Sequence, residues 1–232
     1  MTSLGDSYNA LIIGASGGIG SAFCQVLAAD PACRGLSRLS RRDDGFDVTD
    51  ETSIKNAAEA FASAGQSFDV IVCATGALTI EGRGPEKTIR ALDAEVMARQ
   101  FALNAIGPAL VLKHFAPLLS KNRRAVFAAL SARVGSIGDN RLGGWISYRA
   151  AKAALNQIIR TSAIEITRGN PQSLVVALHP GTVATTLSEK FSGGHERLAP
   201  QDSAARLLSV LDGLGAEESG GFFAYDGAPI DW

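Results

Sequence analysis

Short runs of apolar residues alternate along the chain with longer segments in which apolar residues recur at helical spacing. The runs lie at 10–13, 35–40, 46–48, 70–74, 125–130, 174–178 and 222–225, and the helical segments lie at 18–29, 53–64, 94–119, 147–168 and 200–211. Most runs do not alternate with polar residues, as is typical of strands buried on both faces. The pattern predicts an α/β fold: a single doubly wound domain over 1–232, with a central parallel sheet of about seven strands and helices on both faces.

Composition narrows the class of protein. The chain of 232 residues is 46% hydrophobic and 19% charged with a net charge of -1, so it lacks the basic excess that favours nucleic-acid partners. Its three cysteines, Cys24, Cys33 and Cys73, are not paired closely enough for a zinc or redox motif, and we expect no metal site. We see no targeting signal and no run as long as a membrane span, and we expect a reducing cytoplasm.

The stretch A-L-I-I-G-A-S-G-G-I-G at 10–20 carries an apolar strand into a glycine-rich turn and then into a helix. Glycines at Gly14, Gly18 and Gly20 suit a tight turn, a close approach of backbone to a pyrophosphate, and close packing of helix on strand. The free N–H groups at the helix N-terminus attract phosphate. An empty strand-to-helix turn is the alternative, and the position after the first strand of an α/β pattern favours a dinucleotide site.

Tyr148 and Lys152 lie four residues apart on an alanine-rich helix, which places them on one helix face. That spacing is found in almost any helix and is uninformative alone. Together with the glycine turn, the pair resembles the short-chain dehydrogenase/reductase family over essentially the whole chain. The stretch L-S-A-R-V-G-S-I-G-D-N-R-L-G-G-W-I-S-Y-R-A-A-K at 130–152 and the ending G-G-F-F-A-Y-D-G-A-P-I-D-W at 220–232 resemble more narrowly its small bacterial C-factor-like branch.

The resemblance implies a Rossmann-type fold and a nicotinamide cofactor. The positions that match the family's cofactor site are Gly14, Ser16, Gly18, Ile19, Gly20, Asp47, Val48, Ala74, Thr75, Gly76, Tyr148, Lys152, Pro180, Gly181, Val183 and Thr185. The family's N-N-A-G segment is C-A-T-G here, at 73–76, so both asparagines are missing, and Thr75 is one residue that could replace their polar bonds. The Pro180-Gly181 pair could also be a plain turn, although ligands bind at such strand ends in open α/β sheets.

The resemblance also implies a catalytic set. Tyr148 matches the general acid/base, Ser131 the group that polarises the carbonyl, and Asn104 the residue of a proton relay; Ser136 is an alternative to Ser131 because residues are inserted around 139–144. An ammonium at Lys152 about 4 Å from the phenol could favour the phenolate by up to ~4 kcal/mol, or about three pKa units. Lys152 is therefore expected to lower the pKa of Tyr148. Asn104 could instead satisfy backbone groups freed by Pro108.

Arginines follow the second apolar run, in G-L-S-R-L-S-R-R-D-D at 35–44. Arginine at the end of the second strand suits the 2′-phosphate of NADP, whereas an acidic residue suits the ribose of NAD. We expect NADP, with NAD possible, and place its phosphate at Arg41, with Arg42 next. A solvated basic turn balanced by Asp43 and Asp44 is the alternative.

These inferences favour an NADP-preferring short-chain oxidoreductase that transfers hydride between nicotinamide and a small-molecule carbonyl or alcohol. The alternatives are a dinucleotide-binding signalling module with little turnover, like the C-factor relatives, and an epimerase or lyase. We expect a homo-dimer or homo-tetramer, with close helix packing at Ala150, Ala153 and Ala154. The inserted stretch up to Trp145 and a loop at 186–199, which could act as a lid, would shape the substrate pocket, and His179 could line it.

Overall fold

The computed structural model of the protein describes residues 1–185 and 197–232. Among these residues six strands form one sheet in the order β2-β1-β3-β4-β5-β6, and every neighbouring pair is parallel. The strands are β1 (Tyr8–Ile13), β2 (Cys33–Leu39), β3 (Val70–Cys73), β4 (Ala125–Leu130), β5 (Ser173–His179) and β6 (Phe222–Ala224). The doubly wound fold class is confirmed, with one strand fewer than expected.

The missing strand is the run at 46–48. Ser40 caps a short helix, α2 (Arg41–Asp44), and Gly45 ends it in the left-handed conformation with φ of 67°. Phe46 and Val48 bury their side chains as a strand would. The backbone N–H of Asp47, however, donates to the hydroxyl of Ser53 at 3.0 Å. Side-chain hydrogen bonds thus take the place of a strand ladder, so the prediction of a strand here was wrong.

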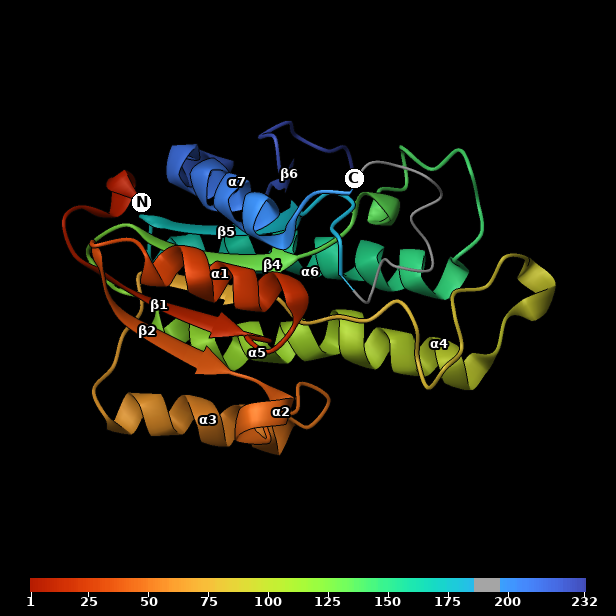
Figure 1. Cartoon of the computed structure of the whole chain (residues 1–232), viewed down its shortest axis with the longest axis horizontal. Helices are drawn as coiled ribbons and strands as arrows, with labels where there is room; N and C mark the ends of the chain where they lie inside the picture. Colours follow the sequence, from red (N-terminus) through yellow and green to blue (C-terminus); the bar gives the residue numbers. More distant parts are fainter. Residues whose placement is uncertain (186–196) are drawn as a thin grey trace.

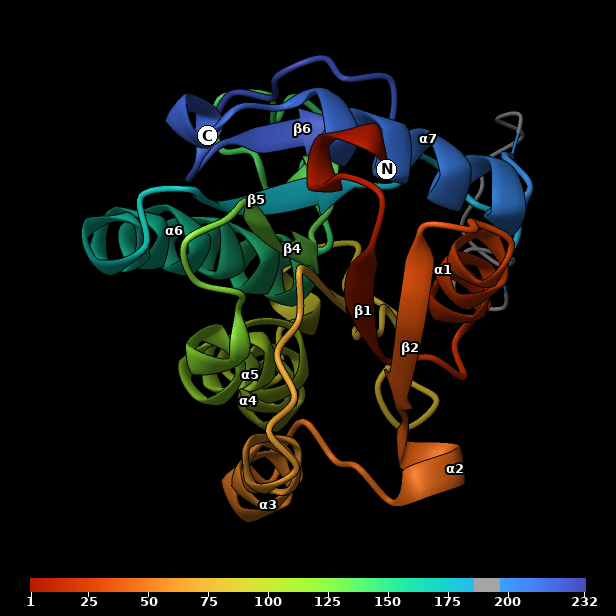
Figure 2. The ribbon, with the colours of Figure 1, turned by 90° about the vertical axis from the view of Figure 1, so that its left-hand side faces the viewer.

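Helices cover both faces of the sheet (Figures 1 and 2). One face carries α1 (Gly18–Ala28) and α7 (Pro200–Gly213), and the other carries α3 (Glu51–Ser63), α5 (Gly107–Phe115) and α6 (Ile146–Gly169). Along β1, Leu11 and Ile13 join the core beneath α3, α5 and α6, whereas Ala10 and Ile12 join the core beneath α1 and α7. Successive strand residues point to opposite faces, and this explains why these strands are apolar throughout.

The long helix expected at 94–119 is interrupted. It consists of α4 (Ala94–Phe101), a π-helical turn η3 (Ala102–Ile106), α5, and a 3-10 turn η4 (Ala116–Leu118). In the π turn the N–H of Gly107 donates to the carbonyl of Ala102, five residues back. Pro108 has no N–H to offer to Asn104, and the wider turn accommodates that loss.

The run Ala94–Leu118 has 25 residues, and an 18-residue window of it has a mean hydropathy of 1.2, so by length and composition it could cross a membrane. The expectation that no run reaches that length was therefore wrong. Val111, Leu112 and Phe115 of this run are buried in the core beneath the sheet. A core helix meets the same length and composition test, so the feature is weak support for a membrane span.

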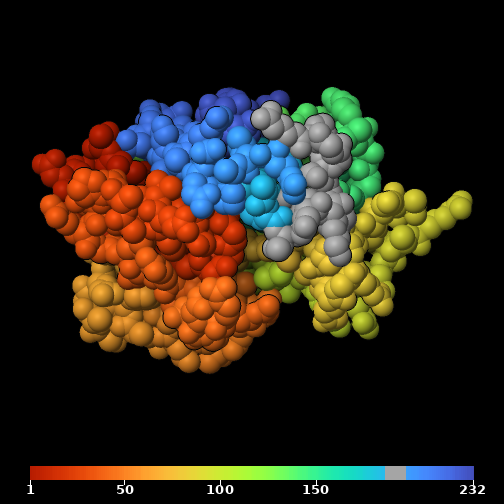
Figure 3. All heavy atoms as spheres, viewed as in Figure 1, coloured from red at the N-terminus to blue at the C-terminus, as the bar shows by residue number. Residues whose placement is uncertain are grey.

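Short turns complete the described chain: η1 (Thr2–Leu4), η2 (Ile89–Ala91), η5 (Arg133–Gly135) and η6 (Ala216–Glu218). The connection between β3 and α4, coloured yellow, projects from one end of the molecule (Figure 3), and its Ile89 is 68% exposed. Of the loop expected at 186–199, residues 186–196 lie outside the described residues.

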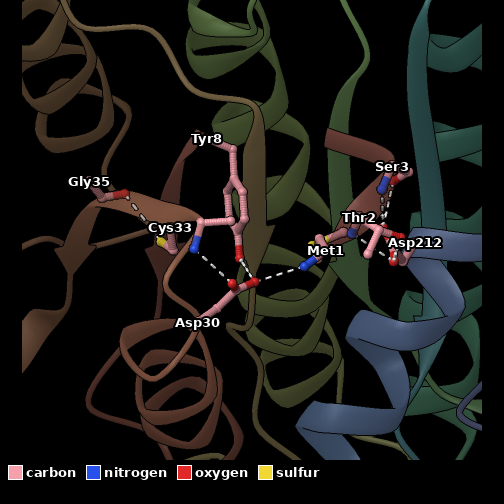
Figure 4. A network of polar contacts seen from close by, with 9 residues as sticks. Met1, Thr2, Ser3, Tyr8, Asp30, Cys33, Gly35 and Asp212 are labelled. Atoms are coloured by element: carbon pink, nitrogen blue, oxygen red, sulfur yellow. Dashed lines mark hydrogen bonds and ion pairs between the residues drawn. The ribbon is translucent and has the colours of Figure 1, made fainter. Parts of the chain in front are cut away.

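Polar contacts tie the N-terminal segment to the turn after α1 and to α7 (Figure 4). Asp30 accepts hydrogen bonds from the Met1 amino group and the Tyr8 hydroxyl, both at 2.7 Å. Asp212 accepts from the backbone N–H groups of Thr2 and Ser3, at 2.9 and 2.8 Å, and from both hydroxyls. The Met1 amino group, followed by the Tyr8 hydroxyl, lowers the pKa of Asp30 from 3.8 to about 2.

Replacing Asp30 with Asn is expected to lower the free energy of unfolding by about 2 kcal/mol at pH 7. Because the folded pKa of Asp30 lies below its ordinary value, its stabilisation is complete above pH ~4 and is lost as the pH falls toward 2. Urea unfolding of both proteins at pH 7 and pH 3 measures this, with the exposed Asp6→Asn as control. An equal loss at the two pH values would contradict the assignment.

Candidate active site

The turn between β1 and α1 is so tight that a side chain does not fit at its glycines. Gly14 has φ of +88°, and a Cβ there would lie 2.9 Å from the carbonyl oxygen of Ala74. A Cβ on Gly20 would collide with the carbonyl of Gly14, and one on Gly18 would lie 2.6 Å from Cγ2 of Thr185. The first amides of α1 follow directly and are available to an anion.

A groove of about 340 Å³ lies beside this turn, at the carboxyl ends of β1, β2 and β3. Nine of the residues expected to bind the cofactor line it: Gly14, Ser16, Arg41, Arg42, Asp47, Val48, Ala74, Thr75 and Gly76. Asp47 accepts hydrogen bonds from the N–H and the hydroxyl of Thr49, at 2.8 and 2.7 Å, which lower its pKa. The structure thus gathers these residues at one edge of the sheet, although 46–48 forms no strand.

A second pocket, of about 200 Å³, opens on the other side of the glycine turn. The other expected cofactor residues that line it are Ile19, Tyr148, Pro180, Gly181, Val183 and Thr185. Gly18 packs against Thr185, which lines this pocket. Gly18, Gly20 and Lys152 line neither the groove nor the pocket: Gly20 packs against the turn, and Lys152 is buried.

The two arginines of the groove differ in their partners. Nε of Arg42 lies 2.8 Å from Oδ1 of Asp43. No described residue forms an ion pair with Arg41, whose side chain is exposed at the groove. Asp43 and Asp44 are occupied with α2 itself, where the hydroxyl of Ser40 accepts from the N–H of Asp43, and the N–H of Ser40 donates to Asp44. Arg41 is therefore the cation more available to a ligand.

Ser131 and Tyr148 both line the second pocket. Ser131 directly follows β4, where its N–H donates to the carbonyl of Leu178 at 2.7 Å, and Tyr148 lies in the first turn of α6. Ser136 lies apart in another surface groove, and its hydroxyl accepts from the N–H of Asp139 at 3.1 Å. The geometry therefore favours Ser131 over Ser136 as the serine beside Tyr148.

Burial dominates the electrostatics of the Tyr148 and Lys152 pair. Nζ of Lys152 lies 5.9 Å from the centre of the Tyr148 ring and donates to the carbonyl of Leu130 at 2.8 Å. Burial raises the pKa of Tyr148 above its ordinary value and lowers the pKa of Lys152 from 10.5 to about 8. Lys152 was expected to bring the pKa of Tyr148 below its ordinary value; in this arrangement desolvation of the phenolate dominates and the net pKa is raised instead.

Asn104 joins the π turn to the segment after β3. Its Oδ1 accepts from the N–H of Ala77 at 3.1 Å, and its Nδ2 donates to the carbonyl of Ala77 at 2.9 Å and to Gln100 at 2.6 Å. These bonds do not go to helix carbonyls near Pro108, as the structural alternative required. A Cβ on Gly76 would lie 2.9 Å from Oδ1 of Asn104 and 3.4 Å from Nζ of Lys152. Gly76 thus lets both groups approach the same point.

In the altered C-A-T-G segment the side chains of Cys73 and Thr75 pair with each other. Oγ1 of Thr75 lies 3.3 Å from Sγ of Cys73, whose pKa is raised by burial. The hydroxyl of Thr75 therefore pairs with the thiol that stands where the family has its first asparagine.

Two further residues shape the pocket. His179 lines it, and its Nδ1 accepts from the N–H of Arg133 at 3.3 Å; burial lowers the pKa of His179 from 6.5 to about 4, so it is neutral. Trp145 also lines the pocket in the left-handed conformation, with φ of 55°, and its ring meets Tyr148 edge to face at 6.5 Å. Such backbone conformations are common at functional sites.

Sequence reasoning missed two buried polar residues of this site. The carboxylate of Glu86 accepts from the N–H of Ser147 at 3.2 Å and from its hydroxyl, and so caps α6. Glu86 lies in the irregular segment before α4, where no periodic signal marks it. Asn156 accepts from the hydroxyl of Ser131 at 2.6 Å. Its position on the face of Tyr148 and Lys152, otherwise rich in alanine, is a signal that could have found it. Among the described residues no acidic, His or Cys cluster could hold a metal ion.

Comparison with known proteins agrees with this geometry. Residues 38–218 match the sequence model of the family described as enoyl-(acyl carrier protein) reductase. The chain is 33% identical to 1-hydroxy-2-glutathionyl-2-methyl-3-butene dehydrogenase of Rhodococcus sp. (strain AD45), over 91% of this chain and 87% of that protein. It is 38% identical to C-signal of Myxococcus xanthus, over 59% of this chain and 78% of that protein, which confirms the narrower resemblance.

Among solved structures, the NADPH-bound carbonyl reductase from chicken fatty liver superposes with a TM-score of 0.80. It is 27% identical, and the match covers 97% of this chain and 99% of that one. Sequence and fold agree: the chain belongs to the short-chain dehydrogenase/reductase family of oxidoreductases.

Proposed function

We propose that the protein transfers hydride between a nicotinamide cofactor, NADP(H) in preference to NAD(H), and a small-molecule carbonyl or alcohol. The observation that carries this proposal is the pocket in which Ser131 and Tyr148 lie together beside the glycine turn. Its other walls are largely apolar, with Leu78, Val134 and Trp145 among them, and its volume of about 200 Å³ suits a compact substrate. The dehydrogenase and carbonyl reductase named above support the same chemistry.

The residues beside the glycine turn fit a dinucleotide. A Cβ at Gly14 would press on the carbonyl of Ala74 and one at Gly18 on Thr185, so glycine at both positions keeps the turn tight. The first amides of α1 would bind the pyrophosphate oxygens. Arg41 would hold the ribose phosphate at one end, and the segment from Pro180 to Thr185 would hold the nicotinamide at the other. When bound, the nicotinamide supplies or accepts the hydride.

The side chains of the pocket supply the proton. Tyr148 keeps its phenol proton at neutral pH because burial raises its pKa, so it can donate that proton to a carbonyl oxygen. Lys152, with a pKa of about 8, is mostly protonated at pH 7 and stabilises the tyrosinate that remains. Ser131 polarises the carbonyl oxygen with its hydroxyl. Asn104, next to Lys152 at Gly76, would return the proton from solvent.

A cofactor titration followed by a substrate panel tests this function. We expect NADPH to bind more tightly than NADH in a fluorescence titration, and at least one aldehyde or ketone to be reduced when NADPH absorbance is followed. Failure to bind either nucleotide would overturn the proposal at its first step.

Replacing Arg41 with Ser is expected to weaken NADPH binding about 10- to 100-fold, because a charged hydrogen bond to phosphate contributes about 1.5–3 kcal/mol. NADH binding should stay within about 2-fold. The matched control is Arg42→Ser, whose smaller effect follows from its pairing with Asp43. Equal weakening for both nucleotides, or a larger effect of the control, would contradict the assignment of the phosphate to Arg41.

The alternative, a signalling module without turnover, is less favoured. The match to C-signal covers 59% of this chain, whereas the match to the Rhodococcus dehydrogenase covers 91%. A module of that kind also has no need for Ser131 and Tyr148 in one pocket.

We propose in addition that the protein is a homo-dimer or homo-tetramer. A groove of about 610 Å³ runs between α5 and the C-terminal half of α6, with Leu112, Ile158 and Ile166 among its walls. Nearby, Ile164 of α6 is 47% exposed. A helix pair of this kind can bury its apolar face against the same pair of a second copy.

Light scattering should give two or four times the monomer mass, and Ile164→Glu should lower the measured mass. A monomeric wild-type protein would contradict the proposal.

A further inference from the structure

We propose that Asn156 is a positioning residue that sets the direction of the Ser131 hydroxyl, by presenting either its amide oxygen or its amide nitrogen to Ser131. This inference rests on the proposed function, since the direction of that hydroxyl matters only if Ser131 meets a substrate oxygen.

Asn156 is well placed for this role. It follows Lys152 by one helical turn on α6 and is only 3% exposed, on the face that meets the end of β4. Its Oδ1 lies 2.6 Å from Oγ of Ser131, which is itself fixed by the bond of its N–H to Leu178. Asn156 therefore contacts the reacting serine from behind, without lining the pocket.

The amide nitrogen of Asn156 is unusual. Nδ2 is buried and has no hydrogen-bond partner among the described residues. Buried polar groups without a partner are rare in folded proteins, since each is costly to desolvate. In this orientation the single proton of the Ser131 hydroxyl points to Oδ1 of Asn156. Ser131 can then accept a hydrogen bond from a molecule in the pocket but cannot donate one.

A half-turn of the terminal amide removes that restriction. The oxygen and nitrogen of an amide have nearly the same shape, so the turn exchanges them at almost the same two positions. Nδ2 then donates to Oγ of Ser131, and the hydroxyl proton is free to point at an oxygen in the pocket. The group left unpaired is then a carbonyl oxygen in place of an NH₂ group.

The two orientations therefore give Ser131 two functions. With Oδ1 toward Ser131 the hydroxyl is held in a resting direction, and with Nδ2 toward it Ser131 becomes the donor that polarises a carbonyl. A carbonyl oxygen in the pocket accepts the freed proton and favours the second orientation, because it forms a hydrogen bond that the first orientation cannot offer.

Two substitutions of Asn156 separate this role from simple packing. Asn156→Asp has the same shape, but its carboxylate only accepts, and so it holds the Ser131 proton away from the substrate. Asn156→Leu removes both partners and leaves the Ser131 hydroxyl free to rotate. The proposal predicts that Asp lowers kcat more than Leu, to near the level of Ser131→Ala, about 100-fold or more below wild type. A packing role predicts the reverse order, because Asp preserves shape and Leu does not.

The readouts are kcat, KM and pH profile for carbonyl reduction with NADPH, with circular dichroism and NADPH titration as checks on folding. Turnover of Asn156→Asp should recover as the pH is lowered, because the protonated carboxyl can donate to Ser131 as the amide does. Combined with Ser131→Ala, neither substitution should lower kcat further. If Asn156→Asp does not fold, Asn156→Leu is compared in the protein with Ser131 and in the Ser131→Ala variant. A further loss of kcat in the Ser131→Ala variant would then contradict the proposal.

Each outcome is decisive. Additive losses in the Ser131→Ala background, or a milder effect of Asp than of Leu, would overturn the role of Asn156 and leave the proposed function intact. A wild-type protein that binds NADPH but reduces no carbonyl would overturn the proposed function, and the role of Asn156 with it.

Discussion

Tyr148→Phe is expected to lower kcat by about 10³-fold or more while NADPH binding stays within about 2-fold. The phenol proton is the one that the pocket offers to a carbonyl oxygen, and burial keeps it on the oxygen of Tyr148 at neutral pH. The phenylalanine ring preserves the edge-to-face contact with Trp145, so the pocket keeps its shape.

The matched control is Tyr8→Phe, which also removes a buried hydroxyl but does so in the network around Asp30. That variant should lose stability and keep its turnover. Steady-state kinetics with a panel carbonyl and a fluorescence titration with NADPH measure both effects. If Tyr148→Phe retained more than a tenth of the wild-type kcat, another group would have to be the proton donor.

Lys152→Met is expected to lose turnover and yet to raise the free energy of unfolding by about 2 kcal/mol at pH 7. Burial lowers the pKa of Lys152 from 10.5 to about 8, so holding the charged form in the fold costs about 3 kcal/mol below pH 8. Loss of the hydrogen bond to the carbonyl of Leu130 reduces the gain in stability by about 1 kcal/mol.

The pH dependence of this gain has a definite sign. Between pH ~8 and ~10.5 the unfolded chain keeps a proton on Lys152 that the folded protein has released, so wild-type stability rises with pH across that window. The advantage of Lys152→Met should therefore shrink above pH 8 and be gone near pH 10.5. Urea unfolding at pH 7 and pH 10 measures it, and the exposed Lys121→Met is the control. A variant less stable than wild type at pH 7 would contradict a costly buried charge.

Much of the fold could be predicted because the apolar runs are strands buried on both faces. Leu11 and Ile12 of β1 face opposite cores, and a run apolar at every position is the direct result. The run at 46–48 also buries its two apolar residues, Phe46 and Val48, yet Ser53 and Thr49 make the hydrogen bonds of a turn there. Apolar composition indicates that a segment is buried, but it does not indicate which groups pair with the backbone N–H and C=O of that segment.

The candidate site likewise has parts that the sequence predicts and parts that depend on the folded chain. The glycine turn and the pair of Tyr148 and Lys152 are each local in sequence, and taken together they were enough to predict the site. The choice of Ser131 over Ser136 depends on which of them lies beside Tyr148, and only the folded chain settles that. The direction of the pKa of Tyr148 was missed because four residues of spacing say nothing about how deeply a phenol is buried.

The π turn at η3 has a consequence for the phase of the helix around it. Each residue turns an α-helix by about 100°, so a turn that takes in one additional residue shifts every later side chain around the axis by about that angle. Before the turn, Gln100 faces the segment after β3; after it, Val111 and Phe115 face the core beneath the sheet. The wide turn thus lets the residues before it and the residues after it each face their own surroundings, which a regular α-helix could not align at the same time. Asn104 lies within this turn.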